Sequence, residues 1–296
     1  MTAARASIAL SMACTLCAVP AHGRQASQPQ EVEASEEDGD EATDRLHLPG
    51  YESRAGKWSL ELGIAPELVS HNPLRRGTET SNAMDLSLIL ATVQPLSHAL
   101  EAEFDVGAVK TIDNGSFSTW AAAAELRTRP DAAGFALFYN YAFAQDYDDW
   151  FGQRQATTHT VTSGLRFGRA LGTTQVGFEL APRWKDSSVD DDDQVAVNLQ
   201  AEVVTPLVED KVYLILDASA ERRWYRNRDP MLAIKRRDWR SATYAGLDLA
   251  GLFGVRDRWL HDLSAGVEWL KVDSNIADQD RSDLALMPVV SVGVSF

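Results

Sequence analysis

Apolar and polar residues alternate with a period of two over most of this chain. Residues 283–296 are the clearest case, because every second residue from Leu284 to Phe296 is apolar, while Asp283, Ser291 and Ser295 fall between them. Residues 100–106 repeat the pattern with acidic residues on the polar face. Side chains of a β-strand point alternately to the two faces of a sheet. The period therefore predicts strands that separate two different environments.

The alternating segments number about twelve and begin near residues 57, 84, 99, 117, 133, 158, 174, 194, 211, 239, 258 and 283. Each is near or above the roughly 9–11 residues of a tilted membrane-spanning strand. Long polar connections fall at 70–83, 110–116, 145–157, 186–193, 226–238 and 273–282, and short ones at 94–98, 129–132, 170–173, 206–210 and 254–257. Bacterial membrane barrels combine an even strand number with short turns on one side and long loops on the other.

The fold class predicted from this pattern is all-β, a single antiparallel up-and-down transmembrane β-barrel of about twelve strands. An even strand number would leave both ends of the barrel on the periplasmic side. A soluble β-sandwich or soluble barrel is the alternative, although it gives no reason for connections that alternate in length.

Two segments precede the predicted barrel at 56–296. Residues 1–23 have one early charge, Arg5, an apolar core and the small-residue sequence Ala21-His22-Gly23, which is typical of a cleaved signal peptide. Residues 24–55 are acidic and poor in apolar residues, so we expect a disordered periplasmic tail. Both cysteines, Cys14 and Cys17, lie in the signal, and the barrel therefore has no disulfide to close it.

The last strand resembles a known family pattern. Outer-membrane barrel proteins of Gram-negative bacteria typically end on an alternating strand with a terminal Phe, which the barrel-assembly machinery reads. The matching positions here are Val290, Val292, Val294 and Phe296. The resemblance implies insertion into the cell outer membrane, among outer-membrane lipid and lipopolysaccharide. Pro288 departs from a regular strand, because proline has no N–H; we expect it at a bulge or a lipid-facing position.

If the apolar face contacts lipid, the polar face lines the lumen and is rich in charge. The predicted lumen-lining residues are Glu61, Glu101, Glu103, Asp105, Glu125, Arg166, Glu179, Arg183, Lys185, Glu202, Asp217, Glu221, Arg223, Asp248, Asp262 and Glu268. They could line a channel for passive passage of small polar or charged solutes. Alternatively they could pair across a narrow lumen and plug it, which would make a structural or anchoring barrel or a component of an export system.

Other charged residues gather in the expected long loops. A basic extracellular loop is predicted to contain Arg226, Arg228, Lys235, Arg236 and Arg237, whose guanidinium groups suit lipopolysaccharide phosphates. The net charge of -15 argues against a nucleic-acid partner. No histidine is followed two residues later by serine, as in some outer-membrane hydrolases, and Asp146, Asp148 and Asp149 with His159 only imitate a protease site. We therefore expect no enzyme, no metal and no cofactor.

Overall fold

The computed structural model describes residues 58–71, 79–112, 117–131, 133–148, 150–188, 193–208, 211–228, 234–253, 260–276 and 279–295. Twelve strands follow one another in chain order within these residues. They are β1 (Trp58–His71), β2 (Glu79–Pro95), β3 (Leu100–Ile112), β4 (Phe117–Thr128), β5 (Phe135–Asp148), β6 (Arg154–Leu171), β7 (Thr174–Ser187), β8 (Gln194–Val208), β9 (Val212–Arg228), β10 (Lys235–Asp248), β11 (Leu260–Ser274) and β12 (Arg281–Ser295). A 3-10 helix, η3 (Ala250–Phe253), precedes β11.

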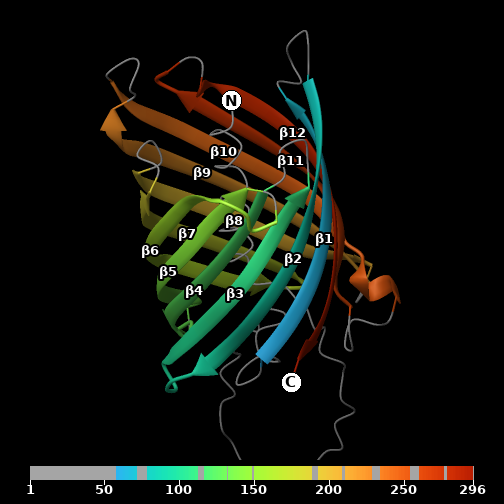
Figure 1. The fold of residues 1–296 in the computed structure, drawn as a ribbon. Helices are drawn as coiled ribbons and strands as arrows, with labels where there is room; N and C mark the ends of the chain where they lie inside the picture. The colour runs from blue at the N-terminus through green and yellow to red at the C-terminus, as the bar shows by residue number, and fades with distance from the viewer. Residues whose placement is uncertain are drawn as a thin grey trace, which may run out of the picture.

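The strands form one closed antiparallel barrel, which confirms the predicted fold class and strand number (Figure 1). Each strand pairs with its chain neighbours, and β12 returns to pair with β1. Ser59 near the start of β1 lies opposite Ser295 at the end of β12. The first and last strands therefore begin and end at the same end of the barrel. The segments 1–23 and 24–55, assigned above to a signal and a tail, lie outside the described residues.

The predicted alternation of connection lengths is confirmed in part: 96–99, 172–173 and 209–211 are short, as predicted, but 129–134 and 249–259 are not. We call the connections that follow odd-numbered strands the odd connections and those that follow even-numbered strands the even connections. The strands continue well into the expected long loops, so that the odd connections are reduced to 72–78, 113–116, 149–153, 188–193, 229–234 and 275–280. The last even connection, 249–259, is the longest of all and contains η3. Polar residues at the end of the barrel with the odd connections still form backbone hydrogen bonds between strands. A strand can continue beyond a membrane with polar side chains on both faces.

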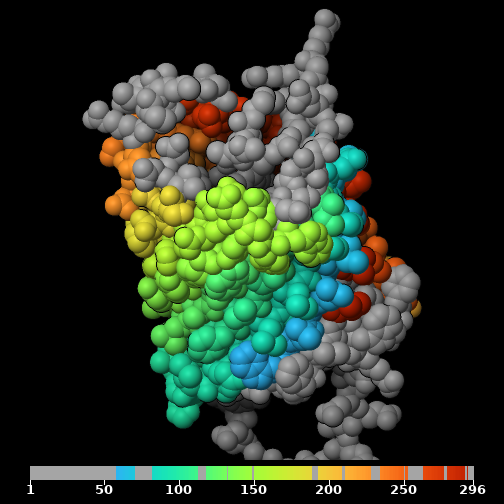
Figure 2. All heavy atoms as spheres, in the orientation of Figure 1, coloured from blue at the N-terminus to red at the C-terminus, as the bar shows by residue number. Residues whose placement is uncertain are grey.

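The outer face of the wall is mainly aliphatic and aromatic away from the odd connections. Leu62 on β1, Leu88 on β2, Val106 on β3 and Leu137 on β5 have exposed fractions of 50%, 49%, 51% and 61%, and all lie on the parity predicted to contact lipid. Figure 2 shows the atoms of the wall packed into a continuous surface over the strands coloured blue to yellow. Among the described residues, no helix is long and apolar enough to cross a membrane.

The interior differs from the core of a soluble barrel. Most of the buried apolar side chains are small, and alanine is the commonest of them. The buried polar residues on the inner parity include Glu101, Glu125, Lys185, Glu221 and Asp238. A soluble barrel fills its centre with branched apolar side chains, whereas this one is polar inside and apolar outside.

Placing a cation on the outer face tests this polarity. Replacing Leu62 with Arg is expected to reduce the free energy of unfolding in lipid vesicles by about 2 kcal/mol or more, because a guanidinium group at bilayer depth loses its hydration. Guanidinium chloride titration of the refolded protein measures the change. Ser87→Arg is the matched control, since Ser87 lies on the inner face of β2. Equal destabilisation by both substitutions would contradict the assignment of the faces.

Candidate functional site: the charged lumen

The charged residues predicted to line the lumen fall on the inner parity of their strands. This placement applies to Glu61, Glu101, Glu103, Asp105, Glu125, Arg166, Glu179, Arg183, Lys185, Glu202, Asp217, Glu221, Arg223, Asp248 and Glu268. The backbone of Asp262 lies in β11, but its side chain is outside the described part of the structure. The structure gathers many of these side chains into two ion-pair networks.

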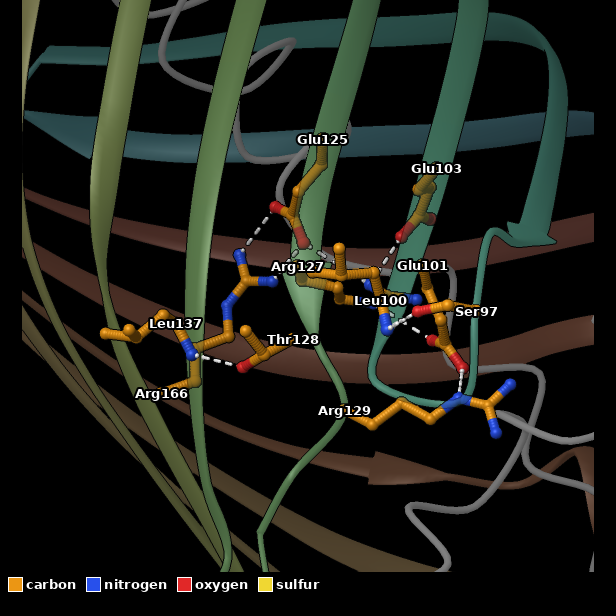
Figure 3. Close-up of polar contacts among 10 residues, drawn as sticks. All are labelled: Ser97, Leu100, Glu101, Glu103, Glu125, Arg127, Thr128, Arg129, Leu137 and Arg166. Carbon is orange, nitrogen blue, oxygen red and sulfur yellow. Dashed lines mark hydrogen bonds and ion pairs between the residues drawn. The ribbon is translucent and has the colours of Figure 1, made fainter.

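The first network is centred on Glu125 of β4 (Figure 3). Arg166 reaches it from β6, two strands away, with Nη1 2.5 Å from Oε1 and Nη2 3.0 Å from Oε2 of Glu125. The Nε atom of Arg166 donates to Glu179 of β7 at 2.7 Å. The Arg166 guanidinium also lies 3.9 Å from the ring centroid of Phe138, on the intervening strand β5. One arginine therefore crosslinks the inner faces of four neighbouring strands.

Arg127 extends the same network to β3. Its Nη1 atom lies 2.6 Å from Glu103 and 3.3 Å from Glu125, and its Nε atom lies 3.6 Å from Glu101. Arg129, in the connection that follows β4, contacts the other oxygen of Glu101 at 2.8 Å. Glu101 and Glu125 have side-chain exposures of only 4% and 8%. Charges buried this far are stable only with partners, which the three arginines supply.

The second network is centred on Glu221 of β9. Arg183 on β7 contacts Glu221, with Nη2 2.5 Å from Oε2. Arg223, which lies on β9 like Glu221, contacts Oε1 of Glu221. On β10, Arg236 binds Asp238 at 2.6 Å and lies over the ring of Tyr225, 4.6 Å from its centroid. Asp238 is only 1% exposed. This network covers the inner faces of β7, β9 and β10.

The two networks lie towards opposite ends of the barrel. Glu101 and Arg127 are next to the even connections, at the start of β3 and the end of β4. Arg223, Arg236 and Asp238 are close to the odd connection between β9 and β10. Between the two levels, inner carboxylates such as Asp217 and Glu268 are only partly buried. The lumen is therefore lined by fixed ion pairs near each end and by more accessible acidic groups in between.

The prediction of a basic loop is wrong. Arg226 and Arg228 belong to β9, and Lys235, Arg236 and Arg237 belong to β10, so all five lie in paired strands. Because successive side chains of a strand face opposite sides of the wall, these five residues do not all lie on one face. Arg236 faces the lumen, whereas Arg226, Lys235 and Arg237 are exposed and share the outer parity. The side chain of Arg228 is outside the described part of the structure.

Sequence reasoning missed Asp238 of the second network, assigned its partner Arg236 to a loop, and missed the Arg281–Asp283 pair on β12. Arg281 lies 3.2 Å from Asp283, at the start of β12. Arg236, Asp238 and Arg281 follow the same period of two as the predicted lumen residues, but they fall in the predicted connections 226–238 and 273–282, whereas Asp283 lies at the start of the predicted last strand. Extending the period beyond the apolar stretch would have placed them on the inner face.

The acidic residues that imitate a protease site are not brought together with His159. Asp146 points inward from β5, is 7% exposed, and accepts a hydrogen bond from Thr119 at 2.6 Å. His159 lies on the outer face of β6, where Nδ1 is 2.8 Å from the Tyr141 hydroxyl oxygen and the ring packs against Phe143. Asp149 is outside the described residues. The wall of the barrel thus separates the two groups that an acid–histidine pair would need to combine.

Among known proteins, no protein-family model and no curated protein matches the chain. Solved structures with a similar fold include the translocator domain of autotransporter NalP from Neisseria meningitidis, with 13% identity, 81% of this chain and 88% of that chain covered, and a TM-score of 0.45. LpxR from Salmonella typhimurium matches at 7% identity over 77% of this chain and 99% of its own, with a TM-score of 0.40. The KdgM porin matches at 9% identity over 79% of this chain and 99% of its own, with a TM-score of 0.42.

Similarity at this level does not bear on function, so the class of the protein rests on its own geometry. A closed antiparallel sheet satisfies its backbone hydrogen bonds internally and leaves no edge. Its outer face is apolar and its interior is charged. These properties together define a membrane-spanning β-barrel.

The Glu125–Arg166 pair gives a quantitative test of the first network. A double-mutant cycle with Glu125→Gln and Arg166→Gln is expected to yield a coupling energy of about 1–3 kcal/mol, because the pair is partly buried and doubly hydrogen-bonded. The cycle is measured by denaturant unfolding in vesicles. Arg226 and Asp186, which lie 3.4 Å apart with exposures of 50% and 45%, form the control pair. We expect less than about 1 kcal/mol there; a coupling of zero at Glu125–Arg166 would refute the assignment.

Proposed function

We propose that the protein is an outer-membrane channel for passive passage of small polar or charged solutes. The main support is that inner-face charges such as Glu61, Asp105, Asp217 and Glu268 are only partly buried, in a barrel of twelve strands. Barrels of about eight strands are filled by their own side chains, and wider ones leave room inside. Partly exposed carboxylates at mid-depth need water around them. A water-filled lumen provides it.

The proposed channel discriminates by charge. Acidic side chains outnumber basic ones on the inner faces of the described strands, and the arginines of the two networks are already paired with carboxylates. The unbalanced charge at mid-depth is therefore negative. A narrow lumen with that charge attracts cations and repels anions.

Conductance in planar bilayers tests this proposal. The refolded protein is expected to give discrete conductance steps, with a reversal potential in a salt gradient that shows a preference for K⁺ over Cl⁻. Replacing Asp217 and Glu268 with Asn and Gln is expected to reduce that preference, whereas the matched substitutions Asp186→Asn and Asp273→Asn, on the outer parity, should leave it unchanged. A folded barrel without conductance would instead favour the plugged structural barrel.

We further propose that the odd connections face the lipopolysaccharide and that the barrel ends at Trp58 and Ser295 face the periplasm. The support is a belt on the outer face of β9–β11. Trp224, Trp239 and Trp269 are 40%, 45% and 49% exposed. Arg226, Lys235 and Arg237 lie at or beyond the tryptophans towards the odd connections. Tryptophan concentrates at membrane interfaces, and arginine binds phosphate.

The belt predicts selective retention of lipopolysaccharide. Replacing Arg226, Lys235 and Arg237 with Gln is expected to reduce the lipid A phosphate that copurifies with the barrel, as measured by mass spectrometry. Arg169→Gln with Lys211→Gln is the control, since these exposed cations lie near the even connections. Greater loss of lipid A in the control would indicate the opposite orientation.

A further inference from the structure

The backbone ladder that closes the barrel is interrupted at its centre. Strands β1 and β12 pair continuously from Ser59↔Ser295 to Ile64↔Val290, and pairing resumes at Leu68↔Leu286. The three positions 65–67 of β1 have no partner among 287–289 of β12. The same residues of β1 pair normally with β2, and those of β12 pair normally with β11. The break therefore belongs to this seam alone and does not reflect irregular strands.

Two opposed prolines account for the break. Counting inward from the flanking pairs places Pro66 directly opposite Pro288. Residues that face each other in an antiparallel ladder either exchange two N–H···O bonds or none, in alternation. If Pro66 and Pro288 occupy a bonded pair, both donors are missing. Loss of both removes that pair and the pair on either side, which is the pattern observed.

The seam between β6 and β7 provides an internal comparison. It is interrupted over two positions, Ser163 and Gly164 opposite Pro182 and Ala181. One proline removes one of the two bonds and leaves the donor of Ser163 in place. The remaining seams are continuous except for register shifts near strand ends. Within the described strands, β1–β12 is thus the seam where both bonds of a central pair are missing.

The break leaves a long stretch of the seam without backbone bonds. From Ile64↔Val290 to Leu68↔Leu286 the strands advance about 13 Å at roughly 3.3 Å per residue. The carbonyl groups of Pro66 and Pro288 also lose their donors, and such groups are strongly unfavourable in lipid. Strand separation at this point therefore breaks few bonds, and water or a polar group in the lumen would satisfy the carbonyls.

The side chains around the break are apolar on the outer face of the wall, and all but one are apolar on the inner face. Ile64, Leu68, Leu286 and Val290 face outward with exposures of 45%, 48%, 49% and 41%. On the inner parity the break is bordered by Ala65 opposite Val289 and by Glu67 opposite Met287. An apolar path therefore runs from the lipid-facing surface to the inner wall between Ala65 and Val289, with the Glu67 carboxyl group beside it.

We propose that the β1–β12 seam is a lateral opening that admits the acyl chain of a membrane amphiphile from the bilayer into the lumen. This goes beyond the proposed channel, which conducts along the barrel axis and does not need the seam to part. Small and flexible side chains at Ala65 and Met287 give the chain room inside. The paired bonds on either side of the break hold the strands together and limit the opening to the middle of the wall.

Photocrosslinking tests the opening directly. The photoreactive amino acid benzoylphenylalanine replaces Met287 on the inner face, in the full chain refolded into vesicles of palmitoyl-oleoyl phosphatidylethanolamine and phosphatidylglycerol. We expect irradiation to produce lipid adducts at this position. Pro66→Val with Pro288→Val restores both N–H donors and is expected to lower the adduct yield by about fivefold or more, given two regained hydrogen bonds.

Two controls and one replacement position make the result decisive. Pro182→Val restores the donor at the β6–β7 seam and should leave the yield at 287 unchanged. The photoreactive residue at outward-facing Leu286 should form adducts in every variant. If the variant at 287 does not fold, as judged by electrophoretic mobility before and after boiling, Val289 takes its place. Absence of adducts at the inner position, or a yield insensitive to the two prolines, would overturn the proposal whether or not the barrel conducts ions.

Discussion

The pairing of β12 with β1 is the interaction on which the rest of the structure depends. An open sheet in lipid would present a row of unbonded N–H and C=O groups, and closure removes that edge. Once the sheet is closed, alternation of side chains fixes the environment of every residue. Leu62 and Val106 then contact the surroundings, while Glu61 and Asp105 face the interior. The ion pairs, the lumen and the belt of tryptophans all follow from that single constraint.

The interior combines rigid and accessible parts. Arg166 ties β4, β6 and β7 together, and Arg183 ties β7 to β9, so that strands not paired through their backbones are linked through their side chains. These links strengthen the side of the wall formed by β3–β10. The opposite side contains the prolines of the closing seam, Pro66 and Pro288. Rigidity is therefore unevenly distributed around the barrel, with reinforcement far from the seam and a weak point in it.

Much of the fold could be predicted from the sequence, because a period of two reports strand number and face directly. The ends of the strands could not be predicted, because the apolar pattern ends at the edge of the lipid while backbone pairing continues beyond it. For this reason the sequence predicts Arg226 and Lys235 in a loop, although both lie in strands. The ion pairs could not be predicted from the sequence either. Glu125 and Arg166 are 41 residues apart, and their contact depends on the register of two seams that periodicity leaves undetermined. The sequence predicts Pro288 at a bulge or a lipid-facing position, and it lies on the lipid-facing parity; that it lies opposite Pro66 can be seen only from the register of the closed barrel.

The central claim is that lipid surrounds the barrel and water fills it, and cysteine scanning of β3 in vesicles tests it most directly. Single cysteines at positions 103–106 are each assayed for reaction with a water-soluble maleimide and for quenching of an attached fluorophore by spin-labelled acyl chains. We predict that 103 and 105 react with the maleimide and that 104 and 106 are quenched, in strict alternation. Uniform maleimide reactivity, or the opposite alternation, would contradict the account.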